Sequence, residues 1–159
     1  MKAILMSIKS QHNRNIEAGK KTSELRKRVP KCEYPIKVYT YESGYDGRHK
    51  VVNEWICKDV TEWRICMGVP AHLPKVACVS TAEIHRYSGK NYDDISEMKI
   101  SNLKLYDEPR ELSEFRTPET RSYEVKRVNG YLIFGDVYRG GNVITRPPQS
   151  WCYVEEIED

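Results

Sequence analysis

Residues 2–28 read KAILMSIKSQHNRNIEAGKKTSELRKR and contain three successive patterns of hydrophobicity. Residues 2–8 are apolar on both faces, which is typical of a buried strand. Its apolar side chains alternate, with Ile4, Met6 and Ile8 on one face and Ala3 and Leu5 on the other. A short polar helix follows, which Ser10 would cap and which would end at Gly19, a residue suited to the position after the C-cap.

The last part of this stretch alternates and predicts a second strand over residues 21–28. That strand would place Thr22, Glu24, Arg26 and Arg28 on one face. Residues 1–31 contain nine Lys or Arg and two acidic residues, a local net charge of +7, whereas the whole chain carries +3. This uneven distribution indicates either a local anionic partner or a solvated charged face.

Strands follow one another along the rest of the chain, with few helices between them. They are expected over residues 36–41, 51–60, 97–106 and 151–154, together with a hairpin over 125–134 that turns at Asn129-Gly130. The apolar phase slips at Ser101-Asn102, which indicates a β-bulge. Ser80 and Glu83 form a capping box that predicts a helix to about Tyr87. Six to eight strands and two or three helices in this order predict an α+β fold or a small β-barrel.

Length and composition predict one domain over residues 1–159. The first apolar run is too short for a signal peptide, and no run approaches the ~18 apolar residues that cross a membrane. A cytoplasmic protein is therefore expected. The five cysteines lack a Cys-x-x-Cys pair, which predicts free thiols and no metal site. No phosphate-binding or dinucleotide-binding glycine loop is present, and no cofactor is predicted.

Three separated motifs occur in order along the chain. They are Ser7-Ile8-Lys9-Ser10-Gln11 with Gly19-x-Lys21-x-x-Glu24-x-Arg26; Ile100-Ser101-Asn102-Leu103-Lys104-Leu105-Tyr106 with Pro109 and Leu112-Ser113-Glu114-Phe115; and Arg146-Pro147-Pro148-Gln149-Ser150-Trp151. Together they resemble the ASCH domain family of the PUA-like superfamily, and the third resembles its bacterial and phage subgroup. The resemblance covers most of the chain but does not extend to residues 42–49 and 116–145. The second of these segments is expected to be an insertion that contains the hairpin.

The resemblance implies a small PUA-like β-barrel with flanking helices and a polar cleft, and it implies an association with RNA or nucleotides. Members of the family have been linked to RNA binding, to RNA cleavage and to deacylation of acetylcytidine. In the amidohydrolase members, a Lys at the position of Lys21 works with a Thr at the position of Glu24. The Glu in this chain departs from that pattern, which leaves ligand binding or water activation by Glu24.

Lys21 and Glu24 are therefore the candidate catalytic residues. The candidate binding residues are Lys9, Ser10, Lys20, Arg26, Asn102, Gln149 and Ser150. The planar guanidinium of Arg26 suits phosphate or a base edge, and the lysines suit phosphate oxygens. A helix beginning near Ser10 would add backbone N–H donors. The alternative for Glu24 is a structural ion pair that orients Arg26.

Three functions remain open from the sequence. The first is a binding module for RNA or a modified nucleotide, with DNA as a further ligand. The second is a hydrolase that acts on a modified nucleoside or RNA through Lys21 and Glu24. The third is a protein-interaction module that uses the hairpin. Four aromatic residues would either stack on a base or lie in the core: Tyr39, Tyr41, Trp55 and Trp151. The histidines are scattered and predict no catalytic pair, and no oligomeric state is predicted.

Overall fold

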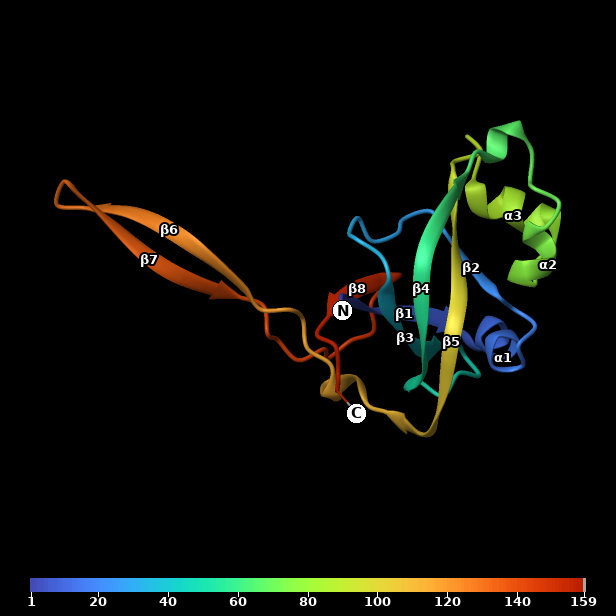
Figure 1. Cartoon of the computed structure of the whole chain (residues 1–159), viewed down its shortest axis with the longest axis horizontal. Helices are drawn as coiled ribbons and strands as arrows, with labels where there is room; N and C mark the ends of the chain where they lie inside the picture. The colour runs from blue at the N-terminus through green and yellow to red at the C-terminus, as the bar shows by residue number, and fades with distance from the viewer. Residues whose placement is uncertain (159) are drawn as a thin grey trace.

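The computed structural model describes residues 1–158, which form a curled six-stranded sheet, three α-helices and a separate two-stranded ribbon (Figure 1). The sheet contains β1 (Ala3–Lys9), β2 (Ser23–Arg26), β3 (Ile36–Ser43), β4 (Val51–Trp63), β5 (Ile95–Arg110) and β8 (Trp151–Val154). The helices are α1 (Ser10–Glu17), α2 (Leu73–Ala77) and α3 (Thr81–Ser88), with 3₁₀ turns at Ile65–Met67 and Leu112–Glu114. The ribbon consists of β6 (Thr120–Val128) and β7 (Tyr131–Arg139). No helix among the described residues combines the length and the apolar character needed to cross a membrane.

The strand order in the sheet is β2-β5-β4-β3-β1-β8. Only β1 and β3 run parallel, and the other neighbours are antiparallel. The sheet curls into a half-barrel with the helices beside it (Figure 1). The α+β class and the predicted numbers of strands and helices are confirmed.

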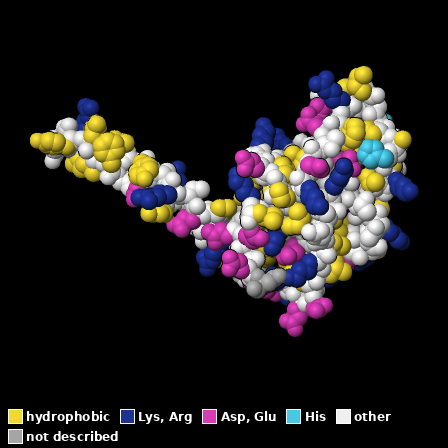
Figure 2. Space-filling model, viewed as in Figure 1, with side chains coloured by type: hydrophobic (Ala, Val, Ile, Leu, Met, Phe, Trp, Pro, Cys, Tyr) yellow, Lys and Arg dark blue, Asp and Glu magenta, His cyan; other side chains and the backbone are white. Residues whose placement is uncertain are grey.

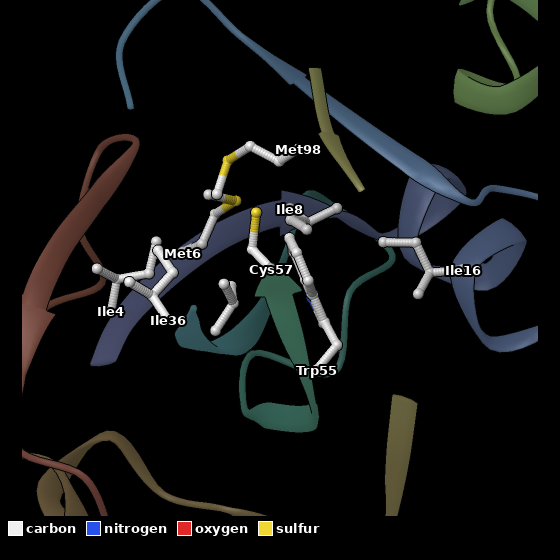
Figure 3. Packing of buried hydrophobic residues seen from close by; sticks show 9 residues of the cluster. Ile4, Met6, Ile8, Ile16, Ile36, Trp55, Cys57 and Met98 are labelled. Atoms are coloured by element: carbon white, nitrogen blue, oxygen red, sulfur yellow. The ribbon is translucent and has the colours of Figure 1, made fainter. Parts of the chain in front are cut away.

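Strand β1 is buried on both faces, as its sequence predicts. One face belongs to the core shown in Figure 3, which consists of Ile4, Met6, Ile8, Ile16, Ile36, Val38, Trp55, Cys57 and Met98. The other face, with Ala3 and Leu5, packs in a second core with Tyr39 and Phe115. A strand without a polar face is stable only between other strands and between two packed layers. This requirement explains why β1 lies between β3 and β8.

Helix α1 begins at Ser10, with Lys9 as the N-cap, and no side chain caps it. The prediction that Ser10 caps the helix was wrong, because its buried hydroxyl instead donates to Asp46 Oδ1 in the loop after β3. The end of the helix is confirmed: Gly19 follows the C-cap residue with φ +70°. Glycine suits this left-handed conformation because it has no Cβ to clash.

A buried polar cluster attaches α1 to the sheet. Asn13 Nδ2 donates to Glu42 Oε2 of β3 at 2.6 Å, and Asn13 Oδ1 accepts from Asn53 Nδ2 of β4 at 2.8 Å. Arg48 donates to both Glu42 and Glu17. Buried polar groups are costly unless they are paired, so these contacts hold the start of α1 in one position against β3 and β4.

The capping box at the start of α3 is confirmed. Ser80 Oγ accepts from the backbone N–H of Glu83 at 3.1 Å, and the Glu83 carboxylate accepts from the backbone N–H of Ser80 at 2.7 Å. Helix α2 was not predicted, because five residues are too few to show a helical period. Its Leu73 packs with Ile84 of α3 and Ile95 of β5 in a third small core, which places both helices at one end of the sheet.

Strand β5 carries the predicted bulge. Its register against β4 shifts between Ser101 and Lys104, and Asn102 has φ +48°. Strand β2 is shorter than predicted, since its ladder with β5 covers only Ser23 to Arg26. Thr22 lies outside the strand because its N–H donates to Val76 O, in α2, at 2.8 Å. Arg28 also lies outside β2.

A buried carboxylate on β5 connects β2 with the helical end of the molecule. Glu97 accepts hydrogen bonds from Ser23 at 2.8 Å and from Trp63 Nε1 at 2.9 Å, and its Oε2 lies 3.1 Å from His72 Nε2. Burial alone would raise the pKa of Glu97, but the hydrogen bonds, with that of His72 first, lower it below its ordinary value. Strand β2 is thus held by this carboxylate as well as by its ladder.

The ribbon projects from the body of the molecule (Figure 1). Its turn at Asn129-Gly130 confirms the predicted hairpin, with φ +48° and +85° at the two residues. At the base of the ribbon, a Cβ on Gly140 would lie 1.9 Å from Pro118 O. The two ends of the ribbon can therefore approach this closely only because residue 140 is glycine.

We expect Ser80→Ala to lower the free energy of unfolding by about 1 kcal/mol, because the substitution removes the N-cap acceptor of α3. Urea unfolding at neutral pH measures the change. Thr81→Ala is the matched control, since Thr81 is exposed and makes no capping bond. Equal losses in the two variants would contradict a capping role for Ser80.

Candidate functional site

A buried carboxylate with a cation on each side lies at the start of β2. Lys21 Nζ is 3.1 Å from Glu24 Oε2, and Arg26 Nε donates to Glu24 Oε1 at 2.9 Å. The three side chains are only 4%, 9% and 12% exposed. Lys21 Nζ also donates to Ala77 O at 2.9 Å. The predicted ion pair between Glu24 and Arg26 is present, and Lys21 completes a cluster of three charges.

Arg26 also joins the two edges of the half-barrel. Its Nη2 donates to Ser7 O of β1 at 2.8 Å, and its Nη1 donates to Ser150 Oγ, next to β8, at 3.2 Å. Beside it, Trp151 Nε1 of β8 donates to Arg28 O at 2.8 Å. Side chains of Arg26 and Trp151 therefore connect the β2 edge with the β1–β8 edge, where the sheet has no backbone ladder.

Glu24 is held in its charged form. Burial on its own would raise the pKa of the carboxyl, but the charges of Lys21 and Arg26 and the hydrogen bond from Lys21 outweigh that effect. The pKa consequently lies below the ordinary value of 4.5. A carboxylate stabilised in this way is a weak base, because protonation would break two ion pairs.

The ion cluster forms part of the wall of a cleft of about 570 Å³. The cleft lies between the β1–α1 corner, β2, α3 and the segment that precedes β8. Five of the residues singled out from the sequence line it: Lys9, Lys21, Glu24, Arg26 and Gln149. The structure therefore brings together residues from both ends of the chain.

The other four predicted binding residues do not line the cleft. Ser10 is engaged with Asp46, and Ser150 lies behind Arg26 as a hydrogen-bond acceptor. Lys20 is exposed beyond the end of α1, and Asn102 is exposed at the bulge of β5. Ser10 and Ser150 therefore have structural roles, and Lys20 and Asn102 lie on other surfaces of the molecule.

His12 lines the cleft and was missed by sequence reasoning. It lies in the first turn of α1, one turn after Lys9 at the end of β1. Burial, and then the charge of Lys21, lower the pKa of His12 below its ordinary value of 6.5. The three-residue spacing of Lys9 and His12 was the available signal, because residues about one helical turn apart lie on the same face.

Helix α3 contributes Arg86 and Tyr87, which are also exposed cleft residues. Lys27 Nζ lies 5.9 Å from the centre of the Tyr87 ring, and the Tyr87 hydroxyl accepts from Lys27 N at 3.3 Å. No sequence pattern could place these residues opposite β1, because α3 reaches the cleft only through its packing on the helical end of the sheet.

The aromatic residues suggested for stacking lie elsewhere. Tyr39, Tyr41 and Trp55 are buried in the two cores. Trp151 packs against the first core and donates to Arg28 O. Of the two alternatives for these residues, a place in the core is confirmed for Tyr39, Tyr41 and Trp55, while Trp151 is half-buried and does not line the cleft. Tyr87 is the exposed aromatic residue among those that line it.

The cleft can act chemically through its cations, its amide and its histidine. Lys9 and Arg86 are exposed and make no ion pair with any residue from 1 to 158. The start of α1 adds backbone N–H groups with no capping side chain. Within that same range, no group of three or more His, Cys, Asp or Glu side chains is arranged to hold a metal ion.

Comparison with solved structures places the fold. The ASCH structure from Zymomonas mobilis superimposes with a TM-score of 0.67 at 14% identity, over 97% of this chain and 88% of that chain. A tyrosine-to-phenylalanine variant of the same protein gives 0.64 at 14% identity, over 98% and 92% of the two chains. A serine-to-alanine variant gives 0.65 at 14% identity, over 97% and 89%. No family model and no curated protein matches the sequence. The chain has the ASCH fold, which confirms the fold implied by the three motifs.

We expect Glu24→Gln to lower the free energy of unfolding at pH 7 by about 3 kcal/mol, because it leaves two buried cations without their partner. The pKa of Glu24 is lower in the folded state, so its contribution is present above the ordinary value of 4.5 and is lost as the pH falls through the folded value. The difference between the two proteins should therefore shrink below about pH 4.5, as measured by urea unfolding at several pH values.

Asp93→Asn is the control for this prediction, since it breaks the exposed ion pair with Lys27. Exposed pairs contribute about 0–1 kcal/mol, so this variant should lose little stability. A Glu24→Gln variant as stable as Asp93→Asn, or a loss independent of pH, would contradict the role of the buried cluster.

Proposed function

We propose that the cleft binds a nucleotide or a short segment of single-stranded RNA. The observation that carries the proposal is the combination of two exposed, unpaired cations, Lys9 and Arg86, with the exposed ring of Tyr87 around one cleft. Phosphate oxygens are the natural partners of such cations, and a base is the natural partner of the ring.

Lys9 and Arg86 come from different elements, β1 and α3, so an anion between them would be held from two directions. The N-terminus of α1 adds N–H donors to the same region. Arg26 does not take this part, although its sequence position suggested it. Three of its five N–H groups already donate to Glu24, Ser150 and Ser7, and these bonds hold the guanidinium in the wall of the cleft.

The polar groups deeper in the cleft are suited to a base. Gln149 carries both an amide donor and a carbonyl acceptor, and Glu24 is a fixed acceptor held by its ion pairs. Tyr87 offers a stacking surface worth ~1–3 kcal/mol per base. The volume of about 570 Å³ lies within the range of roughly 300–1,000 Å³ found for small-ligand sites.

We expect Lys9→Ala and Arg86→Ala each to weaken the binding of a short single-stranded RNA several-fold. Each lost phosphate contact should lower the slope of log K against log salt by about 0.7. Fluorescence anisotropy over roughly 50 to 200 mM salt measures both effects, with DNA oligonucleotides and free nucleotides as parallel ligands.

Lys31→Ala is the matched control, because Lys31 is an exposed cation that does not line the cleft. It should bind as the unmodified protein does. The absence of salt-sensitive binding to RNA, DNA and nucleotides alike would overturn the proposal, as would equal losses in Lys31→Ala and the two cleft variants.

A second candidate function is hydrolysis of RNA or a modified nucleoside, and the position of His12 favours it. A partly buried histidine with a lowered pKa is a free base at neutral pH and suits general base catalysis. In this mechanism His12 takes the proton from water or a ribose hydroxyl. Lys21 and Glu24, the candidate catalytic residues of the sequence, then supply fixed charges beside the reacting atoms, since Glu24 is a weak base.

If the cleft is catalytic, His12→Ala should lower kcat at least 100-fold, the typical contribution of a general base. The rate should rise with pH through a pKa below 6.5 and then level off, since the neutral imidazole is the active form. A screen of short RNAs and modified nucleosides provides the measurement. His85→Ala, outside the cleft, is the control. Turnover unchanged in His12→Ala would remove His12 from the reaction.

A further inference from the structure

The ribbon exposes an unusual amount of apolar surface for a projecting element. Figure 2 shows apolar side chains along its length. Eight of its large apolar side chains are about half exposed or more: Tyr123, Val125, Val128, Tyr131, Leu132, Ile133, Phe134 and Tyr138. Within residues 1–158, strands β6 and β7 form backbone ladders only with each other. An isolated two-stranded ribbon is at best marginally stable in water, and a third strand or a covering layer stabilises it.

The two edges of the ribbon differ in composition. Strand β6 reads TRSYEVKRV and carries four charged residues, whereas β7 reads YLIFGDVYR and carries two, Asp136 and Arg139. Charged side chains, above all Lys, protect an edge strand from pairing with another chain. Edge β6 is therefore better protected than edge β7, which has no Lys and whose first five residues carry no charge.

The sequence of β7 is suited to pairing with itself. An antiparallel pair of β7 strands related by a two-fold axis at Gly135 would place Leu132 opposite Tyr138 and Ile133 opposite Val137. It would also place Tyr131 opposite Arg139 at both ends. Two kinds of pair in this register, Leu132 with Tyr138 and Ile133 with Val137, are apolar on both sides, whereas Phe134 lies opposite Asp136. Apolar cross-strand pairs stabilise a sheet, and so does a cation over an aromatic ring, as with Arg139 opposite Tyr131. Gly135 makes the centre accessible, since nothing lies within 4 Å of the position of a Cβ there.

We infer that a second copy of this chain occupies the β7 edge, so that two ribbons form one four-stranded antiparallel sheet in the order β6-β7-β7-β6. Such a contact is isologous and closes as a dimer. The charged β6 strands become its outer edges, which prevents further growth.

The available surface sets the strength of this dimer. The five exposed apolar side chains of β7 offer about 500 Å² in each copy, or about 1,000 Å² for the pair, which is near the lower limit for a specific interface. The dimer should therefore be reversible and depend on protein concentration in the micromolar range, as expected for a small interface.

Sedimentation equilibrium of the full chain over a range of concentrations tests the inference. We expect a monomer–dimer equilibrium that Ile133→Lys weakens at least tenfold, because it places a charge on the pairing edge. Val125→Lys is the matched control, since Val125 lies on β6 with similar exposure and is not part of the pairing edge. It should leave the dissociation constant within about threefold, below one kcal/mol of change.

A cysteine experiment tests the register. In a Cys66→Ser background, which removes the exposed thiol, Gly135→Cys should form a disulfide-linked dimer under mild oxidation. Paired antiparallel residues lie about 4.5–5.5 Å apart at Cα, within the range of a disulfide. Ser122→Cys on β6 should not cross-link, because about three strand spacings separate the two copies of that residue.

Three results would overturn the inference. If the chain stays monomeric at every concentration, the ribbon does not pair with a second copy, and its partner is a different protein. A dimer weakened by Val125→Lys as strongly as by Ile133→Lys is formed by stacked ribbon faces. A dimer that persists in Ile133→Lys, with no cross-link through Gly135→Cys, forms through another surface. Circular dichroism of each variant verifies that the body remains folded.

Discussion

The carboxylate of Glu24, buried between Lys21 and Arg26, is the contact on which both the barrel and the cleft depend. Its charge is tolerated in a dry position because two cations compensate it. It fixes the guanidinium of Arg26, and the guanidinium reaches the backbone of β1 and the hydroxyl of Ser150. The same ion cluster therefore closes the curled sheet and forms a rigid wall of the cleft.

Because the ion cluster has these two structural roles, Lys21, Glu24 and Arg26 are interpreted mainly as a scaffold for the cleft. The residues whose pattern most suggests chemistry are largely saturated by one another, and the groups free to meet a ligand surround them. Lys9, His12, Arg86, Tyr87 and Gln149 come from four different parts of the chain. A rigid, charged wall with adaptable polar groups around it suits recognition of a ligand, because the fixed dipoles need little reorganisation when the ligand binds.

Sequence patterns predicted the structural features that depend on residues close to one another in the chain. The two-sided burial of β1, the capping box at Ser80, the bulge near Asn102 and the turn at Asn129-Gly130 each follow from local spacing, and each is present. The pairing of Glu24 with Arg26 follows from strand alternation in the same way.

What the sequence could not predict depends on segments that are distant along the chain. Ser10 is diverted from capping by Asp46, and the wall containing Arg86 is set by how α3 packs on Leu73 and Ile95. In the sequence, Trp55 and Tyr39 look the same as aromatic residues that would stack on a base. Only their burial by other strands shows that they belong to the core. Helix α2 is too short to leave a periodic signal.

The position of β1 has a consequence for how the molecule acquires its structure. Its parallel partner β3 begins at Ile36, but its antiparallel partner β8 pairs Ala3 with Val154, almost the full length of the chain away. Until that late partner arrives, the apolar part of β1, Ala3–Met6, has one unpaired side. Pairing at such sequence separation makes folding slow and exposes the unfinished edge to aggregation. Chains truncated before residue 151 should therefore be difficult to keep in solution, even though every residue of the cleft's ion cluster would still be present.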